Sequence, residues 1–309
     1  MKGDKVFIVG CGRTGSTLLR EILNKSEQVC ISPETHFLRR FSRAGVKKEL
    51  KNFGDLLDDG NVKKLVDYLY SKKVRALGAW GWLNKSVDKQ RFTQRILGSD
   101  RSERAIFSLV MQAYTEVNKG GNADDLILGD KTPTHLYYVP TLLEWFPGAK
   151  IIHTFRDPRG IIVSKLKKVE KGLEGPQVRF SYLPEWLLDP LITPIELMHI
   201  TKFWFDAARL HAKYEQLYPQ QYHLVRFEDL ITEPEKQIRQ ICDFLNIEFK
   251  NAMLDEINIV GSSYQSERRG PAGIDKKAID RWREHINPLI RVWFSVSGRK
   301  QLKKFGYTP

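Results

Sequence analysis

Residues 5–20 read KVFIVGCGRTGSTLLR, an apolar run that leads into a turn rich in glycine and hydroxyl side chains. An apolar run of this length, bounded by glycine, predicts a buried strand. The leucine-rich stretch after Ser16 predicts a helix that begins directly below the turn. Such a strand–loop–helix corner directs backbone N–H groups and the positive end of a helix dipole toward one point. The segment therefore predicts a phosphate-binding loop.

Two widespread phosphate-binding patterns fit this loop only in part. Gly10, Gly15 and Thr17 match the nucleoside-triphosphate pattern G-x-x-x-x-G-K-[ST], but Ser16 takes the place of its lysine. Because that lysine neutralises the β- and γ-phosphates, its absence disfavours hydrolysis of ATP or GTP. The dinucleotide pattern G-x-G-x-x-G also matches, and Glu34 follows at the distance of a ribose-binding acid, about 20 residues on. An NAD(P)-dependent oxidoreductase is therefore one alternative.

Residues 13–19, RTGSTLL, resemble the R-[ST]-G-[ST]-[ST] loop of sulfotransferases, which binds the 5′-phosphosulfate of 3′-phosphoadenylyl sulfate (PAPS). A guanidinium group, hydroxyl donors and a helix N-terminus suit a terminal phosphosulfate that needs no bridging metal ion. The resemblance implies an α/β fold with an open, mainly parallel sheet flanked by helices, like the core of P-loop nucleotide hydrolases. It assigns cofactor binding, with no metal, to Arg13, Thr14, Gly15, Ser16 and Thr17.

A second match follows the predicted strand 149–155. Arg156 is followed by Asp157 and Pro158, which suit the N-cap and the first residue of a helix. Ser164 comes eight positions after Arg156, within that helix. The sulfotransferase signature for the 3′-phosphate is an arginine and a serine at this spacing. The resemblance therefore assigns Arg156 and Ser164 to the 3′-phosphate.

Two further matches lie nearer the C-terminus. Residues 268–273, RRGPAG, resemble the R-K-G-x-x-G element that folds over the nucleotide, which implies contacts from Arg268, Arg269 and Gly270. The tryptophan that usually follows this element is displaced to Trp282, an arrangement similar to the carbohydrate- and protein-modifying branches of the family. Residues 224–230 resemble the Y-E-D-L strand end, with Phe227 in place of the tyrosine that contacts the adenine side of the cofactor.

Glu34 and Lys131 are the predicted catalytic residues. Glu34 lies in a segment that resembles the E-T-R element of tyrosylprotein sulfotransferases, with His36 in place of the arginine. In that family the glutamate takes the proton of the acceptor hydroxyl. Lys131 begins a K-T-P sequence that resembles an element of glycan-modifying members, whose lysine stabilises charge on the transferring group. Helix capping is the alternative for Glu34, and a solvated position beside a capped helix is the alternative for Lys131.

Other side chains could serve the same centre. His36 and His135 are alternative bases, because a neutral imidazole accepts a hydroxyl proton near neutral pH. Ser262 or Ser263 could add a hydroxyl group. The predicted strands end at Gly10, Ile31, Gly129 and Phe155, each directly before a predicted site loop. Since the carboxyl ends of parallel strands share one edge of an open sheet, we expect one site there.

Charge and cysteine content narrow the class of protein. The formal net charge of +13 favours anionic partners, which fits a highly charged nucleotide. A non-catalytic polyanion-binding protein is a second alternative, but no finger, homeodomain or RNP-type motif indicates nucleic acid binding. Three cysteines without metal-ligand spacing indicate a reducing compartment, and no apolar run is long enough for a membrane span. We therefore expect a cytoplasmic protein.

The chain is expected to form a single domain, residues 1–309. A helical insertion is predicted over 43–125, and an aromatic, proline-containing stretch over 171–194 suits an acceptor-binding lid. Ordinary surface packing is the alternative for that stretch. A long amphipathic helix is predicted over 195–218. The acceptor is expected to carry a hydroxyl group, on a carbohydrate, a lipid, a small molecule or a peptide.

Overall fold

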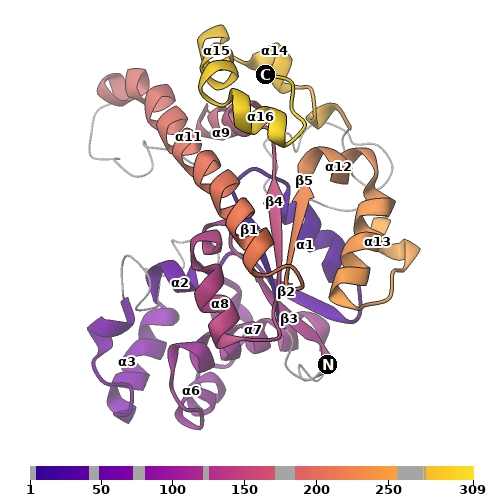
Figure 1. Cartoon of the computed structure of the whole chain (residues 1–309). Coiled ribbons are helices and arrows are strands. Elements are labelled where there is room, and N and C mark those ends of the chain that lie inside the picture. The colour runs from indigo at the N-terminus through magenta and orange to yellow at the C-terminus, as the bar shows by residue number, and fades with distance from the viewer. Residues whose placement is uncertain are drawn as a thin grey trace. The chain divides into compact units, whose positions relative to one another are not determined.

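The computed structural model describes residues 5–41, 49–71, 81–120, 125–170, 185–255, 274 and 276–309, with the backbone alone for 185–191. Within these residues the strands form a sheet in the order β2-β3-β1-β4-β5 (Figure 1). They are β1 (Lys5–Gly10), β2 (Val29–Ser32), β3 (Ile127–Lys131), β4 (Lys150–Phe155) and β5 (Tyr222–Arg226). β3 pairs in parallel with both β1 and β2. The predicted open, mainly parallel α/β sheet with flanking helices is confirmed.

The strand ends differ slightly from the prediction. β1 and β4 end at Gly10 and Phe155 as expected, whereas β2 continues to Ser32 and β3 to Lys131. β3 is longer because Lys131 is the register partner of Ile8 on β1, so the strand stays paired through the lysine. Lys131 is thus held by the sheet itself and not by the loop that follows it.

The chain divides into two compact units, the first of which comprises residues up to Val9 with 22–152 and 242–253. Its aromatic core is centred on Phe37, whose ring stacks on Phe107 with the ring centroids 4.7 Å apart. Phe107 also stacks on Phe7 of β1, so helix and sheet share one core. The helices of this unit are α2 (Phe37–Arg40), η1 (Glu49–Phe53), α3 (Asp59–Leu69), α5 (Gly81–Ser86), α6 (Lys89–Leu97), α7 (Glu103–Lys119), η3 (Pro133–Tyr138), α8 (Val139–Trp145) and most of η4 (Asn251–Leu254).

The regular elements among the described residues between 49 and 119 are all helices. Side-chain caps begin these helices, with Asp58 before α3, Asp88 before α6 and Ser102 before α7. The limits of 43–125 for a helical insertion, and the single domain over 1–309, remain predictions.

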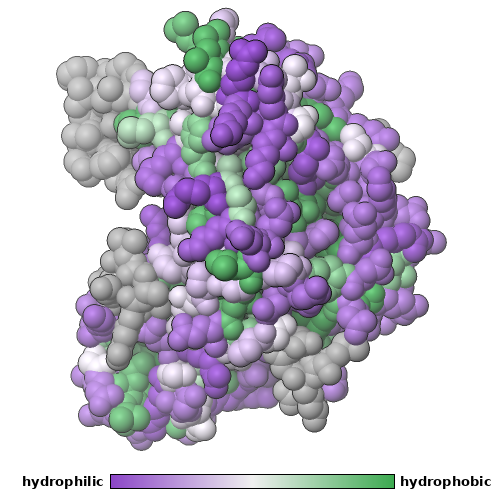
Figure 2. Space-filling model, in the orientation of Figure 1, coloured by the Kyte–Doolittle hydropathy of each residue, from purple (hydrophilic) through white to green (hydrophobic). Residues whose placement is uncertain are grey.

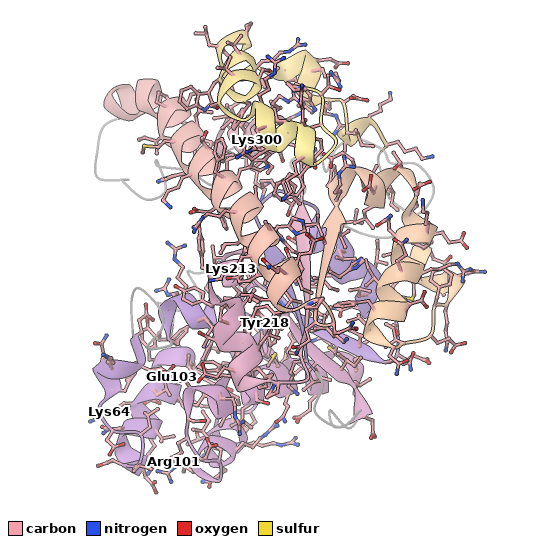
Figure 3. The ribbon with its side chains drawn as sticks, viewed as in Figure 1. Lys64, Arg101, Glu103, Lys213, Tyr218 and Lys300 are labelled. Carbon is pink, nitrogen blue, oxygen red and sulfur yellow. The ribbon has the colours of Figure 1, made fainter. Side chains whose placement is uncertain are left out.

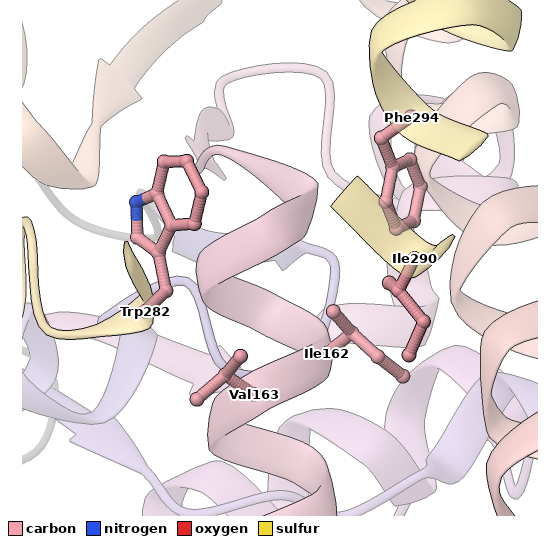
Figure 4. Packing of buried hydrophobic residues seen from close by; sticks show 5 residues of the cluster. All are labelled: Ile162, Val163, Trp282, Ile290 and Phe294. Carbon is pink, nitrogen blue, oxygen red and sulfur yellow. The ribbon is translucent and has the colours of Figure 1, made fainter. Parts of the chain in front are cut away.

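The second unit comprises residues 10–21, 153–241 and 254–309. Its core includes Ile162 and Val163 of α9, which pack with Trp282, Ile290 and Phe294 (Figure 4). Burial of large apolar side chains of this kind contributes about 1.5–3 kcal/mol each. The helices here are α9 (Pro158–Glu170), α11 (Glu185–Leu217), α12 (Phe227–Thr232), η6 (Lys276–Ala278), α14 (Trp282–His285), α15 (Pro288–Ser297), α16 (Arg299–Lys304) and most of α1 (Ser16–Asn24) and α13 (Pro234–Leu245).

Two parts of this unit differ from the sequence prediction. α11 starts at Glu185 instead of residue 195, and it continues through Pro190 and Pro194. Packing of Leu197 and Ile200 against the buried cluster fixes the helix axis, and tertiary packing of this kind overrides local propensity. Residues 171–184 of the predicted lid lie outside the described residues, and 185–194 belong to α11. Phe227 was expected at the end of a strand, but it is the first residue of α12.

Candidate active site

The turn of residues 12–17 has the backbone geometry of a phosphate-binding loop. Arg13 has φ 67° and Gly15 has φ 79°, so consecutive peptide planes turn inward. A side chain at Gly15 would place its Cβ 2.6 Å from the ring of Phe227, so only glycine fits. The Leu19 amide donates to the Gly15 carbonyl, which begins the i→i−4 hydrogen bonds of α1. The backbone amides before Leu19 lie ahead of these helical hydrogen bonds, where an anion can accept from them. No acidic side chain lies in the first turn of α1, which leaves the positive helix end suited to an anion.

Thr14 fixes the loop to β4. Its Oγ1 donates to the Cys11 carbonyl at 2.7 Å and lies 2.7 Å from Thr154 Oγ1. Because the single hydroxyl hydrogen of Thr14 is committed to Cys11, the Thr154 hydroxyl donates to Thr14. Thr14 thus supports the loop, and its predicted contact with the cofactor stays a prediction. Ser16 and Thr17 open α1, with Ser16 buried and Thr17 half-buried.

Arg13, Arg156 and Ser164 come together although they are far apart in the sequence. Arg13 Nε donates to Ser164 Oγ at 3.0 Å, across 151 positions. Arg156 Nη1 donates to the carbonyl of Arg13 at 3.1 Å, and Arg156 Nη2 donates to the carbonyl of Ala278 at 2.7 Å. Two guanidinium groups and a hydroxyl are thus linked through Arg13, in the loop that precedes α1, and they are a donor set typical of a phosphate site.

Arg156 is held in one orientation by its surroundings. Its guanidinium carbon lies 4.0 Å from the centroid of the Phe227 ring. A Cβ at Gly160 would lie 2.9 Å from Arg156 Nε, so the absence of a side chain there makes room for the guanidinium. Burial lowers the pKa of Arg156 to about 10, with Glu228 opposing this and Arg13 adding to it. The group therefore remains cationic at neutral pH.

Glu228, a residue to which the sequence assigned no role, connects the start of α9 with the C-terminal segment. Its Oε1 accepts from the Asp157 amide at 3.1 Å, and its Oε2 accepts from the Tyr307 hydroxyl at 2.9 Å. Burial raises the pKa of Glu228, against the lowering effect of its hydrogen bonds and of Arg156. The signal in the sequence that could have indicated this role is the position of Glu228 directly after Phe227, a predicted cofactor-binding residue. Trp282, the displaced tryptophan, is buried, and the Arg159 guanidinium lies 4.4 Å from its ring centroid.

In the first unit, Glu34 and Lys131 form a close ion pair. Lys131 Nζ lies 2.6 Å from Glu34 Oε1, and His36 Nε2 lies 3.4 Å from Glu34 Oε2. Lys131 is 3 % exposed, whereas the Glu34 side chain is 37 % exposed and reachable from solvent. Burial raises the pKa of Glu34, but the charge and the hydrogen bond of Lys131, together with the nearby His36, outweigh this effect, so the pKa lies below its usual value. The structure thus brings together the two predicted catalytic residues.

A second buried pair supports the first. Asp130 Oδ1 lies 3.0 Å from His135 Nδ1, and both side chains have no exposed surface. Asp130 Oδ2 accepts from Ser32 Oγ and from the Thr35 amide, at 3.3 Å and 3.2 Å. These contacts tie the segment that carries Glu34 to the strand that carries Lys131. Sequence reasoning missed Asp130 because a lone aspartate before a lysine carries no pattern.

The two alternative bases differ in their surroundings. His135 Nε2 accepts from the Leu38 amide at 3.3 Å and its Nδ1 faces Asp130, so both ring nitrogens have neighbours in the protein. His36 has φ 51° and contacts Glu34, and burial foremost lowers the pKa of His36. His36 is therefore neutral at neutral pH. Among the alternatives, His36 has the better access to an acceptor.

Several predicted site residues lie outside the described residues. They are Arg268, Arg269, Gly270, Ser262 and Ser263. Within the part of the chain that the structure describes, no cluster of three or more His, Cys, Asp or Glu could hold a metal ion. Among the same residues, no helix has the length and apolar character of a transmembrane segment.

These features are those of an α/β fold that has a loop suited to an anion in its second unit and a carboxylate–lysine pair in its first. Residues 5–251 match the profile of the sulfotransferase family, and this chain belongs to that family. A relative is the omega-hydroxy-beta-dihydromenaquinone-9 sulfotransferase Stf3 of Mycobacterium tuberculosis (strain CDC 1551 / Oshkosh), which is 25 % identical over 305 residues. That alignment covers 90 % of this chain and 74 % of the relative.

Two solved structures share the fold. The sulfotransferase domain from the Synechococcus PCC 7002 olefin synthase has a TM-score of 0.56 at 19 % identity, covering all of this chain and 96 % of that domain. The sulfotransferase domain from the curacin biosynthetic pathway has a TM-score of 0.55 at 21 % identity, covering all of this chain and 99 % of that domain. Since the chain belongs to the sulfotransferase family, it is a transferase that moves sulfuryl groups.

Proposed function

We propose that this sulfotransferase takes its sulfuryl group from PAPS and transfers it to an acceptor hydroxyl. The observation that carries the proposal is the hydrogen bond from Arg13 to Ser164 beside the buried guanidinium of Arg156. In the proposal, the 12–17 loop holds the 5′-phosphosulfate, while Arg156 and Ser164 hold the 3′-phosphate. Phe227 lies against Arg156 and is assigned to the adenine side of the nucleotide. Arg268, Arg269 and Gly270 are proposed to add contacts to it.

The proposed chemistry is an in-line displacement at sulfur. Glu34 removes the proton of the acceptor hydroxyl while the acceptor oxygen forms a bond to sulfur. The bond from sulfur to the bridging phosphate oxygen breaks, and 3′-phosphoadenosine 5′-phosphate leaves with the bonding electron pair. Lys131 and Arg13 stabilise the negative charge that grows on the bridging oxygen, which is worth about 3–4 kcal/mol for a well-placed donor. No step uses a metal ion.

A second possible base is His36. Its separation of 3.4 Å from Glu34 supports a role in positioning the carboxylate, and its neutral state would let it accept a proton. We favour Glu34, because the partner Lys131 keeps the carboxylate ionised and ready to accept.

The acceptor class is proposed only as a hydroxyl compound, whether carbohydrate, lipid, small molecule or peptide. The Mycobacterium relative is named for a hydroxylated menaquinone derivative. His36 stands where tyrosylprotein sulfotransferases have arginine, which argues against a peptidyl tyrosine. We also propose a cytoplasmic location, supported by three cysteines, Cys11, Cys30 and Cys242, which are buried and form no disulfide.

Thermal unfolding with a panel of nucleotides tests the donor. A ligand at 100 times its Kd adds about 2.7 kcal/mol, which raises the Tm by about 2–4 °C. We expect this shift with 3′-phosphoadenosine 5′-phosphate and not with Mg-ATP, NAD or NADP. A shift with NAD or NADP alone would point to a dinucleotide site instead. Binding of heparin without a shift by the bisphosphate would point to a polyanion-binding protein.

A further inference from the structure

α15 has apolar side chains on two faces. Ile290 and Phe294 point into the buried cluster, which accounts for one face (Figure 4). The other face presents large apolar side chains to solvent, namely Leu289, Val292, Trp293 and Val296, which are 78 %, 58 %, 48 % and 73 % exposed. These positions follow the i, i+3, i+4, i+7 spacing of one helix face. We call these four residues the α15 patch.

The α15 patch continues onto α11. Trp293 Nε1 donates to Thr201 Oγ1 at 3.2 Å, so the indole polar group is satisfied while much of its ring stays exposed. Met198, one turn before Thr201, is 63 % exposed. Figure 2 shows apolar surface over α15 beside a strongly hydrophilic area. Contiguous exposed apolar side chains of this size mark an interaction site more often than single exposed residues do.

Basic side chains are frequent on α15 itself and on α16, the helix that follows it. Residues 281–309 contain seven lysines and arginines but a single acidic residue, Glu284. Neither α15 nor α16 contains an acidic residue. Lys300 lies on α16, which follows α15 directly (Figure 3). The exposed basic residues of the two helices are Arg291, Arg299, Lys300, Lys303 and Lys304.

We propose that the α15 patch and the basic residues of α15 and α16 dock this protein on an anionic lipid bilayer. Helices that lie in the bilayer interface combine exposed apolar and aromatic side chains with lysine and arginine, as α15 and α16 do. Tryptophan is favoured at the level of the headgroups, and basic residues are attracted by anionic lipids. A protein partner fits less well, because a stable interface takes about 800 Å² and 20–30 residues from each side. One helix face is too small for that, whereas a fluid bilayer needs no matching shape.

Co-sedimentation with lipid vesicles tests the proposal. The probes are vesicles of phosphatidylcholine alone and of equal parts phosphatidylcholine and phosphatidylglycerol. Saturating 3′-phosphoadenosine 5′-phosphate is added so that the proposed nucleotide site does not contribute to anion binding. We expect binding to the anionic vesicles only, weakening as salt screens the charges.

Two double variants separate the apolar and basic contributions. Leu289→Glu with Val296→Glu removes apolar contacts, and Arg299→Glu with Lys300→Glu removes charge attraction. Each pair is expected to lower the vesicle partition coefficient at least about tenfold. All four side chains are exposed, so the fold is expected to persist, which an unchanged Tm checks. The matched controls are Leu57→Glu, 75 % exposed, and Lys63→Glu with Lys64→Glu on α3, of which Lys64 is labelled in Figure 3. They are expected to bind as the wild type does.

Any of three results would overturn the proposal. One is wild-type protein that stays in the supernatant with anionic vesicles. Another is a Leu289→Glu, Val296→Glu variant that still binds vesicles. The third is that this variant loses self-association in sedimentation velocity instead, which would assign the patch to a second copy of the chain. Vesicle binding is independent of the nucleotide panel above, so each proposal can fail without the other.

Discussion

Lys131 Nζ and Glu34 Oε1 lie 2.6 Å apart although the residues are separated by 97 positions in the chain. Parallel pairing of β2 with β3 produces this contact, since Ser32 is the register partner of Asp130. Lys131 is the next residue of β3, and Glu34 lies two residues beyond the end of β2. The ion pair is therefore a consequence of strand register and not of local sequence. Its chemistry gives the first two predictions.

Glu34→Gln is expected to lower kcat by roughly 10²–10⁴ because the amide cannot accept the acceptor proton. The side chain keeps its size, so binding of 3′-phosphoadenosine 5′-phosphate, measured by calorimetry, is expected to stay at the wild-type value. The matched control is Glu49→Gln, which removes a comparable ion pair with Arg40. Wild-type turnover in Glu34→Gln would show that Glu34 serves only the local fold.

Lys131→Gln is expected to move the acidic limb of the kcat/KM profile to higher pH. Burial raises the pKa of Glu34, and the Lys131 charge is the largest influence that opposes it. An enzyme whose base has a lowered pKa becomes inactive only at low pH. Without the Lys131 charge the pKa of Glu34 rises, so the activity falls at a pH nearer to neutrality. Lys131→Arg keeps the charge and is expected to keep the limb in place. If the acidic limb of the kcat/KM profile of Lys131→Gln lies at the same pH as in the wild type, Glu34 is not the titrating base.

Asp130→Asn is expected to destabilise the protein by about 3 kcal/mol, since loss of one partner in a buried pair costs about 3–5 kcal/mol. The pKa of Asp130 is lowered, because His135 and hydrogen bonds from Thr132 and Thr35 outweigh the raising effect of burial. Because the pKa of Asp130 is lower in the folded protein than in the unfolded chain, its ionised form stabilises the fold. This stabilisation is fully present above the unfolded-state pKa of about 4, and it is lost as the pH falls through the pKa of the folded state.

Urea unfolding at a series of pH values measures this contribution. Wild-type stability is expected to fall more steeply below about pH 4 than that of Asp130→Asn. Parallel curves for the two proteins would contradict an ionised Asp130 in the native state.

Gly15→Ala is expected to cost about 1–3 kcal/mol, the usual range for a residue forced into a rare backbone conformation. The position combines φ 79° with the Phe227 ring 2.6 Å from the added Cβ. Gly12→Ala, in the same loop, is the matched control, because its Cβ would meet nothing within 4 Å. Chemical unfolding of both variants provides the comparison, and equal stability would remove the steric reason for glycine at position 15.

The sequence predicts the loops better than the contacts between them. Glycines and helix caps mark the 12–17 loop and the start of α9 because their causes are local. Asp130 and His135 could not be paired in advance, since their contact depends on how η3 folds back after β3. Gly160 gives no signal either, because its role is to leave space for a side chain four positions before it. Pro190 and Pro194 misled the prediction of α11, where packing along the rest of the helix outweighs two local breakers.

Calorimetric titration of 3′-phosphoadenosine 5′-phosphate into wild type and Arg156→Ala tests the central claim most directly. Arg239→Ala is the control, since Arg239 is an exposed arginine of the same unit that pairs with Glu235. Loss of a charge-assisted contact costs about 1.5–3 kcal/mol, so Arg156→Ala is expected to weaken binding about 10- to 150-fold, while Arg239→Ala binds normally. Equal affinity in Arg156→Ala and wild type, or no binding by either, would contradict a PAPS site built on Arg156.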